Sequence, residues 1–221
     1  MDDPRPPSDP PTAGTSAEGA APSVAPLGAP RDGRAMLQRI RHQWGPTDDL
    51  WVFGYASLIW RPEFDADEHR PGLVRGWHRA LRMRSRVNRG TPDRPGLVFA
   101  LMPGGSCRGM VYRVARARAD AELDRLWARE MINSVYDPRW LPCQTAQGRV
   151  MALAFTLSRR SPSYTGRLPD EEIIQILRLA QGHCGSTLDY LCETARCLDE
   201  RGMTDHEVRR LMALARQHRL A

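Results

Sequence analysis

The chain has 221 residues, of which 41% are hydrophobic and 26% charged, and 32 basic against 26 acidic residues give a formal net charge of +6. No run of about 18 apolar residues occurs, which excludes a transmembrane helix. The start is acidic and proline-rich, so we expect no secretory signal peptide. All basic residues are arginines, which is typical of a genome-wide compositional bias, so the charge does not favour a nucleic-acid partner.

Residues 1–33 have the composition of a disordered tail. This Pro/Ala-rich stretch holds eight of the 18 prolines and no aromatic residue. Such a segment cannot bury enough apolar surface to offset the entropy lost on ordering. We therefore expect a disordered tail over 1–33 and a single folded domain over 34–221.

The first predicted elements are a short helix over 34–43 and a buried strand over 51–53 that ends at Gly54. Apolar residues and arginines then alternate over 81–87, which predicts a strand with one polar face. Further strands, separated by glycine and proline, are expected over 97–102, 110–114 and 150–157.

Helices are expected between and after these strands. One covers about 120–132, and another begins after Pro169, where three acidic residues occupy the first turn. The last two helices are delimited by a Ser186–Asp189 capping box, a stop at Gly202, and a Thr204–Glu207 capping box. The chain is therefore predicted to be α+β, with a β-rich centre and inserted and appended helices.

The segment from Phe53 to Leu58 is the first candidate for a functional site. A buried strand runs there into a loop of small residues, and such loops expose backbone N–H groups that can bind a carboxylate or a developing oxyanion. An ordinary strand-to-turn transition has the same pattern. Ser57 lacks the G-x-S-x-G context of a serine hydrolase, so nucleophilic serine chemistry is not favoured.

Glu130 is the second candidate. The apolar stripe of its predicted helix contains Leu123, Leu126 and Trp127, and the helical period places Glu130 on the same buried face. Burial should raise the pKa of this carboxyl group, which suits a proton shuttle near neutral pH. Alternatively, Glu130 lies past the core edge or pairs with an arginine. Arg129 lies about 100° round the helix and is not the obvious partner.

The remaining polar residues do not indicate a metal site. Arg82, Arg84 and Arg86 form either a solvated strand face or a positive rim that attracts an acidic small molecule. The six histidines form no metal-like cluster, and the five cysteines contain no C-x-x-C pair. The odd cysteine count argues against a disulfide framework, so we expect reduced thiols and a cytoplasmic protein.

A series of short motifs follows one order along the chain. It runs Trp51-Val-Phe-Gly-Tyr-Ala-Ser-Leu-Ile-Trp60, Gly76-Trp-His-Arg79, Arg89-Gly-Thr91, Pro95-Gly96, Gly109-Met-Val-Tyr112, Leu126-Trp-Ala-Arg-Glu-Met131, Tyr136-Asp-Pro-Arg-Trp140, Tyr164-Thr-Gly166, Gly185 and Leu188-Asp-Tyr-Leu191. With these motifs in this order, the chain resembles the ChaC-type γ-glutamylcyclotransferases over about 50–217.

The resemblance implies a fold, a reaction and a set of site residues. The fold is a small, mostly antiparallel β-barrel with flanking helices, and the reaction cleaves glutathione to 5-oxoproline and cysteinylglycine without a metal, nucleotide or redox cofactor. Glu130 matches the essential glutamate of the family, and Tyr164 matches a pocket tyrosine. The loop that cradles the γ-glutamyl group matches Val52, Phe53, Gly54, Tyr55, Ala56, Ser57 and Leu58.

One residue departs from the family pattern, because Ala56 stands where the family usually has glycine. If that position requires a positive φ, alanine is strained there; if φ is negative, the methyl group only narrows the pocket. Two alternatives therefore stay open: a cyclotransferase for other γ-glutamyl amines or amino acids, and a non-catalytic binding protein on the same fold. Intact Glu130 argues against the second.

A nucleic-acid binder is disfavoured because basic runs with interleaved aromatics are absent. The sequence does not indicate an oligomeric state.

Overall fold

The structure is a computed structural model that describes Met1 and residues 31–221. Most of the predicted tail over 1–33 lies outside these residues, so its disorder stays a prediction. Asp32 caps the first helix, α1 (Gly33–Gln43), by accepting hydrogen bonds from two backbone N–H groups. Gly33, the last residue of the predicted tail, therefore belongs to this helix.

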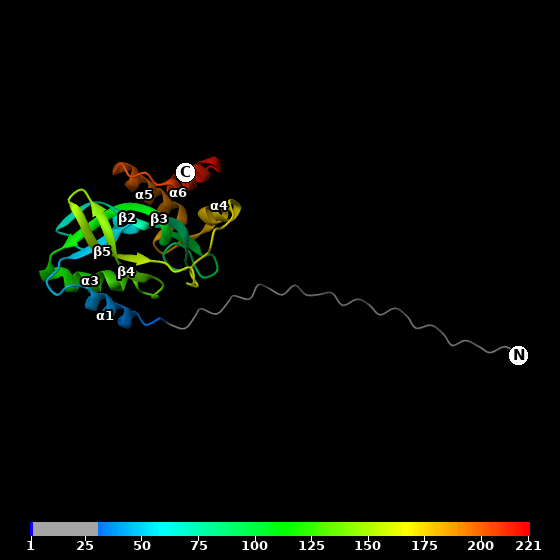
Figure 1. Cartoon of the computed structure of the whole chain (residues 1–221). Helices are drawn as coiled ribbons and strands as arrows, with labels where there is room; N and C mark the ends of the chain where they lie inside the picture. The colour runs from blue at the N-terminus through cyan, green and yellow to red at the C-terminus, as the bar shows by residue number, and fades with distance from the viewer. Residues whose placement is uncertain (2–30) are drawn as a thin grey trace.

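Five strands close into a barrel in the order β1-β3-β2-β4-β5 (Figure 1). Their bounds are β1 Leu50–Gly54, β2 Glu68–Ser85, β3 Gly96–Val114, β4 Asp137–Thr145 and β5 Gly148–Thr156. Neighbouring strands are antiparallel, except that β5 runs parallel to β1 and β3 where the barrel closes. The prediction of a small, mostly antiparallel barrel is thus confirmed.

The two longest strands, β2 and β3, correct the strand predictions in this region. The strand expected over 81–87 is only the last part of β2, which ends at Ser85, and the strands expected over 97–102 and 110–114 are both parts of β3. Gly104 and Gly105 have φ values of +104° and +69°, and the pairing register shifts opposite them. These glycines form a bulge that bends the ladder without ending it.

The sequence prediction missed β4, which contains Pro138 and Pro142. Proline cannot donate a ladder hydrogen bond and usually indicates that a segment is not a strand. β4 pairs with β5 along its whole length but with β2 at only two positions. Much of one edge of β4 is therefore free of ladder bonds, and such an edge tolerates proline.

Helices cover two sides of the barrel (Figure 1). α1 and α3 (Arg116–Glu130) lie on one side, and α4 (Asp170–Leu179), α5 (Thr187–Glu200) and α6 (His206–Gln217) lie on the other. The helix expected over 120–132 begins earlier than predicted and ends at Glu130. The remaining elements are short: α2 Ser57–Trp60, β6 Gln181–Gly182 and β7 Gly185–Ser186.

Helix caps show one confirmed prediction and one correction. The capping box at the start of α5 is present between Ser186 and Asp189. The second predicted box is wrong, because Asp205 rather than Thr204 caps α6, its carboxylate accepting from the Val208 N–H at 3.0 Å. The same carboxylate pairs with the buried guanidinium of Arg79. An aspartate can fill both roles at once, whereas a threonine hydroxyl cannot neutralise the arginine.

The end of β1 packs unusually close to β3. A Cβ atom on Gly109 would lie 2.9 Å from Cζ of Phe53 and would press on the Gly54 carbonyl oxygen. Only glycine permits this approach, so Gly109 allows β3 to support the strand end from which the loop at 55–58 departs.

The five cysteines are all free thiols, and burial raises the pKa of Cys107 and Cys143 to about 11. Among the described residues, no three or more His, Cys, Asp or Glu side chains are placed to hold a metal ion. The same part of the chain has no helix long and apolar enough to cross a lipid bilayer.

Candidate active site

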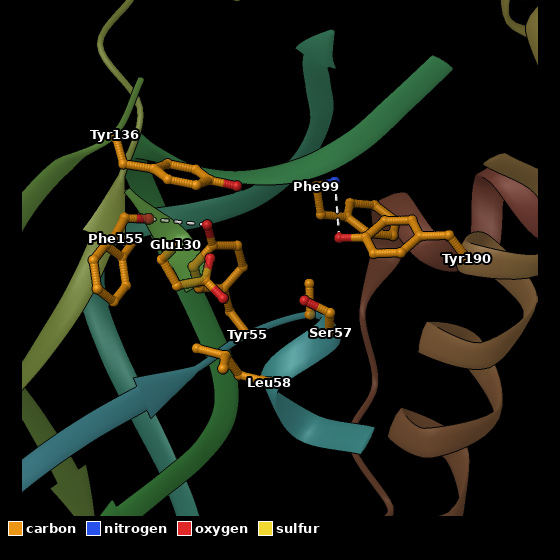
Figure 2. Close-up of a pocket in the computed structure, with 9 residues that line it drawn as sticks. Tyr55, Ser57, Leu58, Phe99, Glu130, Tyr136, Phe155 and Tyr190 are labelled. Carbon is orange, nitrogen blue, oxygen red and sulfur yellow. Dashed lines mark hydrogen bonds between the residues drawn. The ribbon is translucent and has the colours of Figure 1, made fainter. Parts of the chain in front are cut away.

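A small pocket with an empty volume of about 280 Å³ opens where β1 ends. Its lining residues are Tyr55, Ala56, Ser57, Leu58, Phe99, Glu130, Tyr136, Phe155 and Tyr190. In Figure 2, Tyr136 and Glu130 lie on one side of the pocket, and Phe99 and Tyr190 lie on the other. Residues from both sides of the barrel therefore meet at this point.

The loop in the pocket turns sharply from β1 into α2. A Cβ atom on Gly54 would lie 3.0 Å from Cβ of Leu58, so the chain folds back on itself there. The Ala56 carbonyl accepts from the Ile59 N–H at 2.8 Å, and the Tyr55 hydroxyl donates to the Phe155 carbonyl at 2.9 Å. The first N–H groups of a helix have no partner within it, so those of Ser57 and Leu58 need a partner from outside α2.

The structure separates the predicted binding residues into two groups. Tyr55, Ala56, Ser57 and Leu58 line the pocket. Val52 and Phe53 are fully buried in the core, and with Gly54 they pair against β3. Tyr164 is also outside the pocket lining: its backbone forms an isolated bridge with Met83, and it packs partly buried against the core.

Ala56 is buried and has a φ of −147°. This angle lies outside the left-handed region that favours glycine. Of the two consequences considered for an alanine at this position, backbone strain from a positive φ therefore does not apply. The methyl group lines the pocket and narrows it.

Glu130 is the last residue of α3, and its side chain is 14% exposed. Burial raises the pKa of its carboxyl group, the nearby Arg129 charge opposes that rise, and the Glu63 charge adds to it. The helical period thus placed this carboxylate correctly on the buried face. A carboxyl group with a raised pKa in a pocket can both accept and return a proton near neutral pH.

Arg129 corrects a sequence-based interpretation, because it is the ion-pair partner of Glu130. Its Nε lies 3.1 Å from Oε1 of Glu130. Adjacent residues normally point to different faces of a helix. Here the helix ends at Glu130, so the long arginine side chain can fold round the helix end.

Three tyrosines line the same pocket as the Glu130 carboxylate and add neutral hydroxyl groups to it. Burial raises the pKa of Tyr55, Tyr136 and Tyr190, and the charge of Glu130 raises each of them further. They therefore stay protonated at neutral pH. The Tyr190 hydroxyl accepts from the Phe99 N–H at 3.2 Å, which ties α5 to β3 across the pocket.

Sequence reasoning assigned no site role to four of the lining residues. Tyr136 and Tyr190 occur in the ordered motifs, which could have indicated them. Phe99 and Phe155 lie in buried strands, and nothing in their local pattern distinguishes them from other core phenylalanines.

Comparison with known proteins agrees with this architecture. The chain matches the family model described as ChaC-like protein over residues 50–218. It is 36% identical over 157 residues to the glutathione-specific gamma-glutamylcyclotransferase of Escherichia coli K12, covering 71% of this chain and 68% of the relative. It is 31% identical over 183 residues to glutathione-specific gamma-glutamylcyclotransferase 1 of Homo sapiens, covering 80% and 81%.

A solved structure supports the fold in the same way. The crystal structure of a yeast gamma-glutamyl cyclotransferase specific to glutathione superposes with a TM-score of 0.71 at 19% identity, covering 76% of this chain and 96% of that one. With the family match spanning the barrel, the pocket and the C-terminal helices, the chain belongs to the ChaC-like protein family.

Proposed function

We propose that this protein is a γ-glutamylcyclotransferase that cleaves glutathione to 5-oxoproline and cysteinylglycine, with Glu130 as the proton shuttle. The observation that carries the proposal is the buried carboxylate of Glu130, which shares one small pocket with the loop at 55–58. Membership of the ChaC-like family and the names of the E. coli and human relatives support glutathione as the substrate.

The reaction begins with proton transfer from the substrate. The α-amine of the γ-glutamyl group is an ammonium ion near neutral pH and cannot attack until it loses a proton. The Glu130 carboxylate takes that proton, and the amine nitrogen then bonds to the γ-carbonyl carbon of the same molecule. When the tetrahedral intermediate collapses, Glu130 returns the first proton to the departing amine nitrogen and the bond to cysteinylglycine breaks. The attacking nitrogen, which is positively charged after attack, loses its second proton to the freed carboxylate and from there to solvent, leaving the ring amide of 5-oxoproline.

The loop supplies the other part of the chemistry. Backbone N–H groups around Ala56 and Ser57 donate to the oxygen that becomes negative during attack. Attack within one molecule closes a five-membered ring, and holding the γ-glutamyl chain folded can supply about 7 kcal/mol of the barrier in well-aligned cases. Acid–base chemistry and backbone donors suffice for these steps, so we assign no cofactor.

The size of the pocket favours recognition of the γ-glutamyl group alone. Even its empty volume of about 280 Å³ includes open solvent, so the enclosed space is smaller than this figure. We infer that the γ-glutamyl end enters and that cysteinylglycine extends outward. Other γ-glutamyl amines or amino acids then remain alternative substrates, because they present the same group to the pocket.

Individual residues take the following proposed parts. Tyr55, Ala56, Ser57 and Leu58 contact the γ-glutamyl group, while Val52, Phe53 and Gly54 hold the loop in place from β1. Tyr164 lies outside the lining, and its contact with the substrate stays a prediction. We place the reaction in the cytoplasm, where free thiols such as those of this chain stay reduced.

The test is incubation of the purified protein with glutathione alone, with 5-oxoproline and cysteinylglycine measured in equal amounts. N-acetylated glutathione is the matched control, because its blocked amine cannot attack; its cyclisation at a comparable rate would contradict the mechanism. Release of 5-oxoproline from other γ-glutamyl amines but not from glutathione would favour the alternative substrates. Binding of glutathione without product would identify a non-catalytic binding protein.

A further inference from the structure

Arg129 contacts both the carboxylate of Glu130 and the start of α2. Its Nε lies 3.1 Å from Oε1 of Glu130, and its Nη2 lies 3.5 Å from Oγ of Ser57, 72 positions earlier in the chain. The Arg129 side chain is only 20% exposed. One guanidinium therefore lies between the carboxylate at the end of α3 and the loop that lines the same pocket.

The same guanidinium also holds the segment that follows α2. Its Nη1 donates to the Arg61 carbonyl and, at 2.8 Å, to the Pro62 carbonyl, and it lies 3.2 Å from Oε2 of Glu63. Glu63 has a φ of +57°, a conformation that costs energy for a residue other than glycine. The Arg129 contacts stabilise this bend in the chain.

We propose that Arg129 is a positioning residue that holds the Glu130 carboxylate against the pocket and locks the segment at 61–63 to the end of α3. The proposal rests on the function assigned to Glu130 above. The planar, multiple-donor guanidinium suits this task, because it reaches two carboxylates and two carbonyls at once. A lysine ammonium could not match that geometry.

The groups that face Glu130 make opposite predictions for two substitutions. Arg129 from α3 lowers the pKa of Glu130, whereas Glu63 from the segment after α2 raises it. The other titratable groups that line the pocket are the neutral hydroxyls of Tyr55, Tyr136 and Tyr190. Removing the cation should therefore raise the pKa of Glu130, and removing the Glu63 charge should lower it.

The experiment compares the pH dependence of kcat/KM for glutathione in Arg129→Gln and Glu63→Gln. The acid limb should report ionisation of Glu130. In Arg129→Gln it should move to higher pH, with a loss of kcat/KM about tenfold greater on the acid side than on the plateau. In Glu63→Gln it should move to lower pH. A loosened segment alone would lower the rate at every pH without moving the limb.

Two further variants separate charge from geometry. Arg129→Lys keeps the positive charge but lacks the planar guanidinium with its several donors. Its acid limb should therefore stay closer to the wild-type position while its plateau kcat falls. Arg196→Gln is the matched control, because Arg196 pairs only with Glu193 and Glu200 on the exposed surface of α5 among the described residues, and its profile should not change.

A second readout does not depend on turnover. The carboxyl ¹³C resonance of Glu130, assigned by its absence in Glu130→Gln, should titrate at higher pH in Arg129→Gln and at lower pH in Glu63→Gln. If it does so while no 5-oxoproline forms, the proposed function fails and the role of Arg129 stands. Unmoved titration in a folded Arg129→Gln, or shifts of the same sign in both variants, would overturn the role. If Arg129→Gln does not fold, Glu63→Gln and Arg129→Lys decide it by the same titration.

Discussion

Two charged side chains inside the protein, Arg79 and Glu130, are satisfied in different ways. The Arg79 side chain is completely buried, and its nitrogens donate to the Tyr55 carbonyl, to the Arg108 carbonyl at 2.7 Å and to the Asp205 carboxylate. The Glu130 side chain is 14% exposed, its pKa is raised, and its ion-pair partner Arg129 is shared with other acceptors.

The difference teaches how one domain uses buried charge for two purposes. A buried charge with matched partners on three sides favours a single arrangement of the surrounding chain. A buried carboxylate with incomplete compensation stays poised to exchange a proton. Tyr55 connects the two charged residues. Its backbone carbonyl accepts a hydrogen bond from Arg79, and Tyr55 lines the pocket that contains Glu130. The structural charge thus supports the loop on which the reactive charge depends.

The largest expected effect concerns the reactive charge. Glu130→Gln keeps the shape of the side chain but removes the proton acceptor, so turnover of glutathione should fall by about 10² to 10⁴. Steady-state kinetics would measure the loss, and circular dichroism should show an unchanged fold. Wild-type turnover in this variant would contradict a proton shuttle at Glu130.

The structural charge should show the converse behaviour. Arg79→Met removes one partner of a buried ion pair and leaves Asp205 and two carbonyls unmatched, which should cost about 3–5 kcal/mol of unfolding free energy. Urea denaturation measures this cost, with Arg82→Met on the same strand as the matched control, expected within about 0.5 kcal/mol of the wild type. A loss below about 1 kcal/mol for Arg79→Met would show that the matched partners contribute little.

Substitutions at Ala56 test the role of the loop at 55–58. Valine adds bulk to a buried wall of the pocket, so Ala56→Val should reduce kcat/KM by about 10² or more while the protein stays folded. Ala56→Gly enlarges the pocket and should leave kcat/KM unchanged or higher. A folded and fully active valine variant would remove this loop from the active site.

The smallest expected effect is on stability and depends on pH. Because the folded-state pKa of Glu130 is raised, the folded protein binds this proton more tightly than the unfolded chain does. Wild-type stability should therefore fall as the pH rises from the ordinary glutamate range through the raised pKa. Glu130→Gln cannot ionise, so its thermal midpoint relative to the wild type should increase over that window. A thermal midpoint of Glu130→Gln that decreases relative to the wild type as the pH rises would contradict the raised pKa. Glu200→Gln, at an exposed position, serves as the control.

Several features could be predicted from the sequence because they depend on neighbouring residues. The Ser186–Asp189 capping box involves residues three positions apart, and the burial of Glu130 follows from the helical spacing of Leu123 and Leu126. The ordered motifs identified the family, and with it the barrel and the loop at 55–58. Such short-range patterns can be recognised in the sequence because backbone geometry repeats every few residues.

Other features depended on the tertiary structure. The prolines of β4 concealed a strand whose partly free edge exists only in the closed barrel, and Asp205 caps α6 where it also meets the distant Arg79. The opposite wall of the pocket, with Phe99 and Tyr190, is assembled from β3 and α5. Arg129 pairs with Glu130 because the helix ends there against the segment that follows α2. Contacts of this kind are decided by which chain segments meet when the barrel closes, and no local periodicity encodes that meeting.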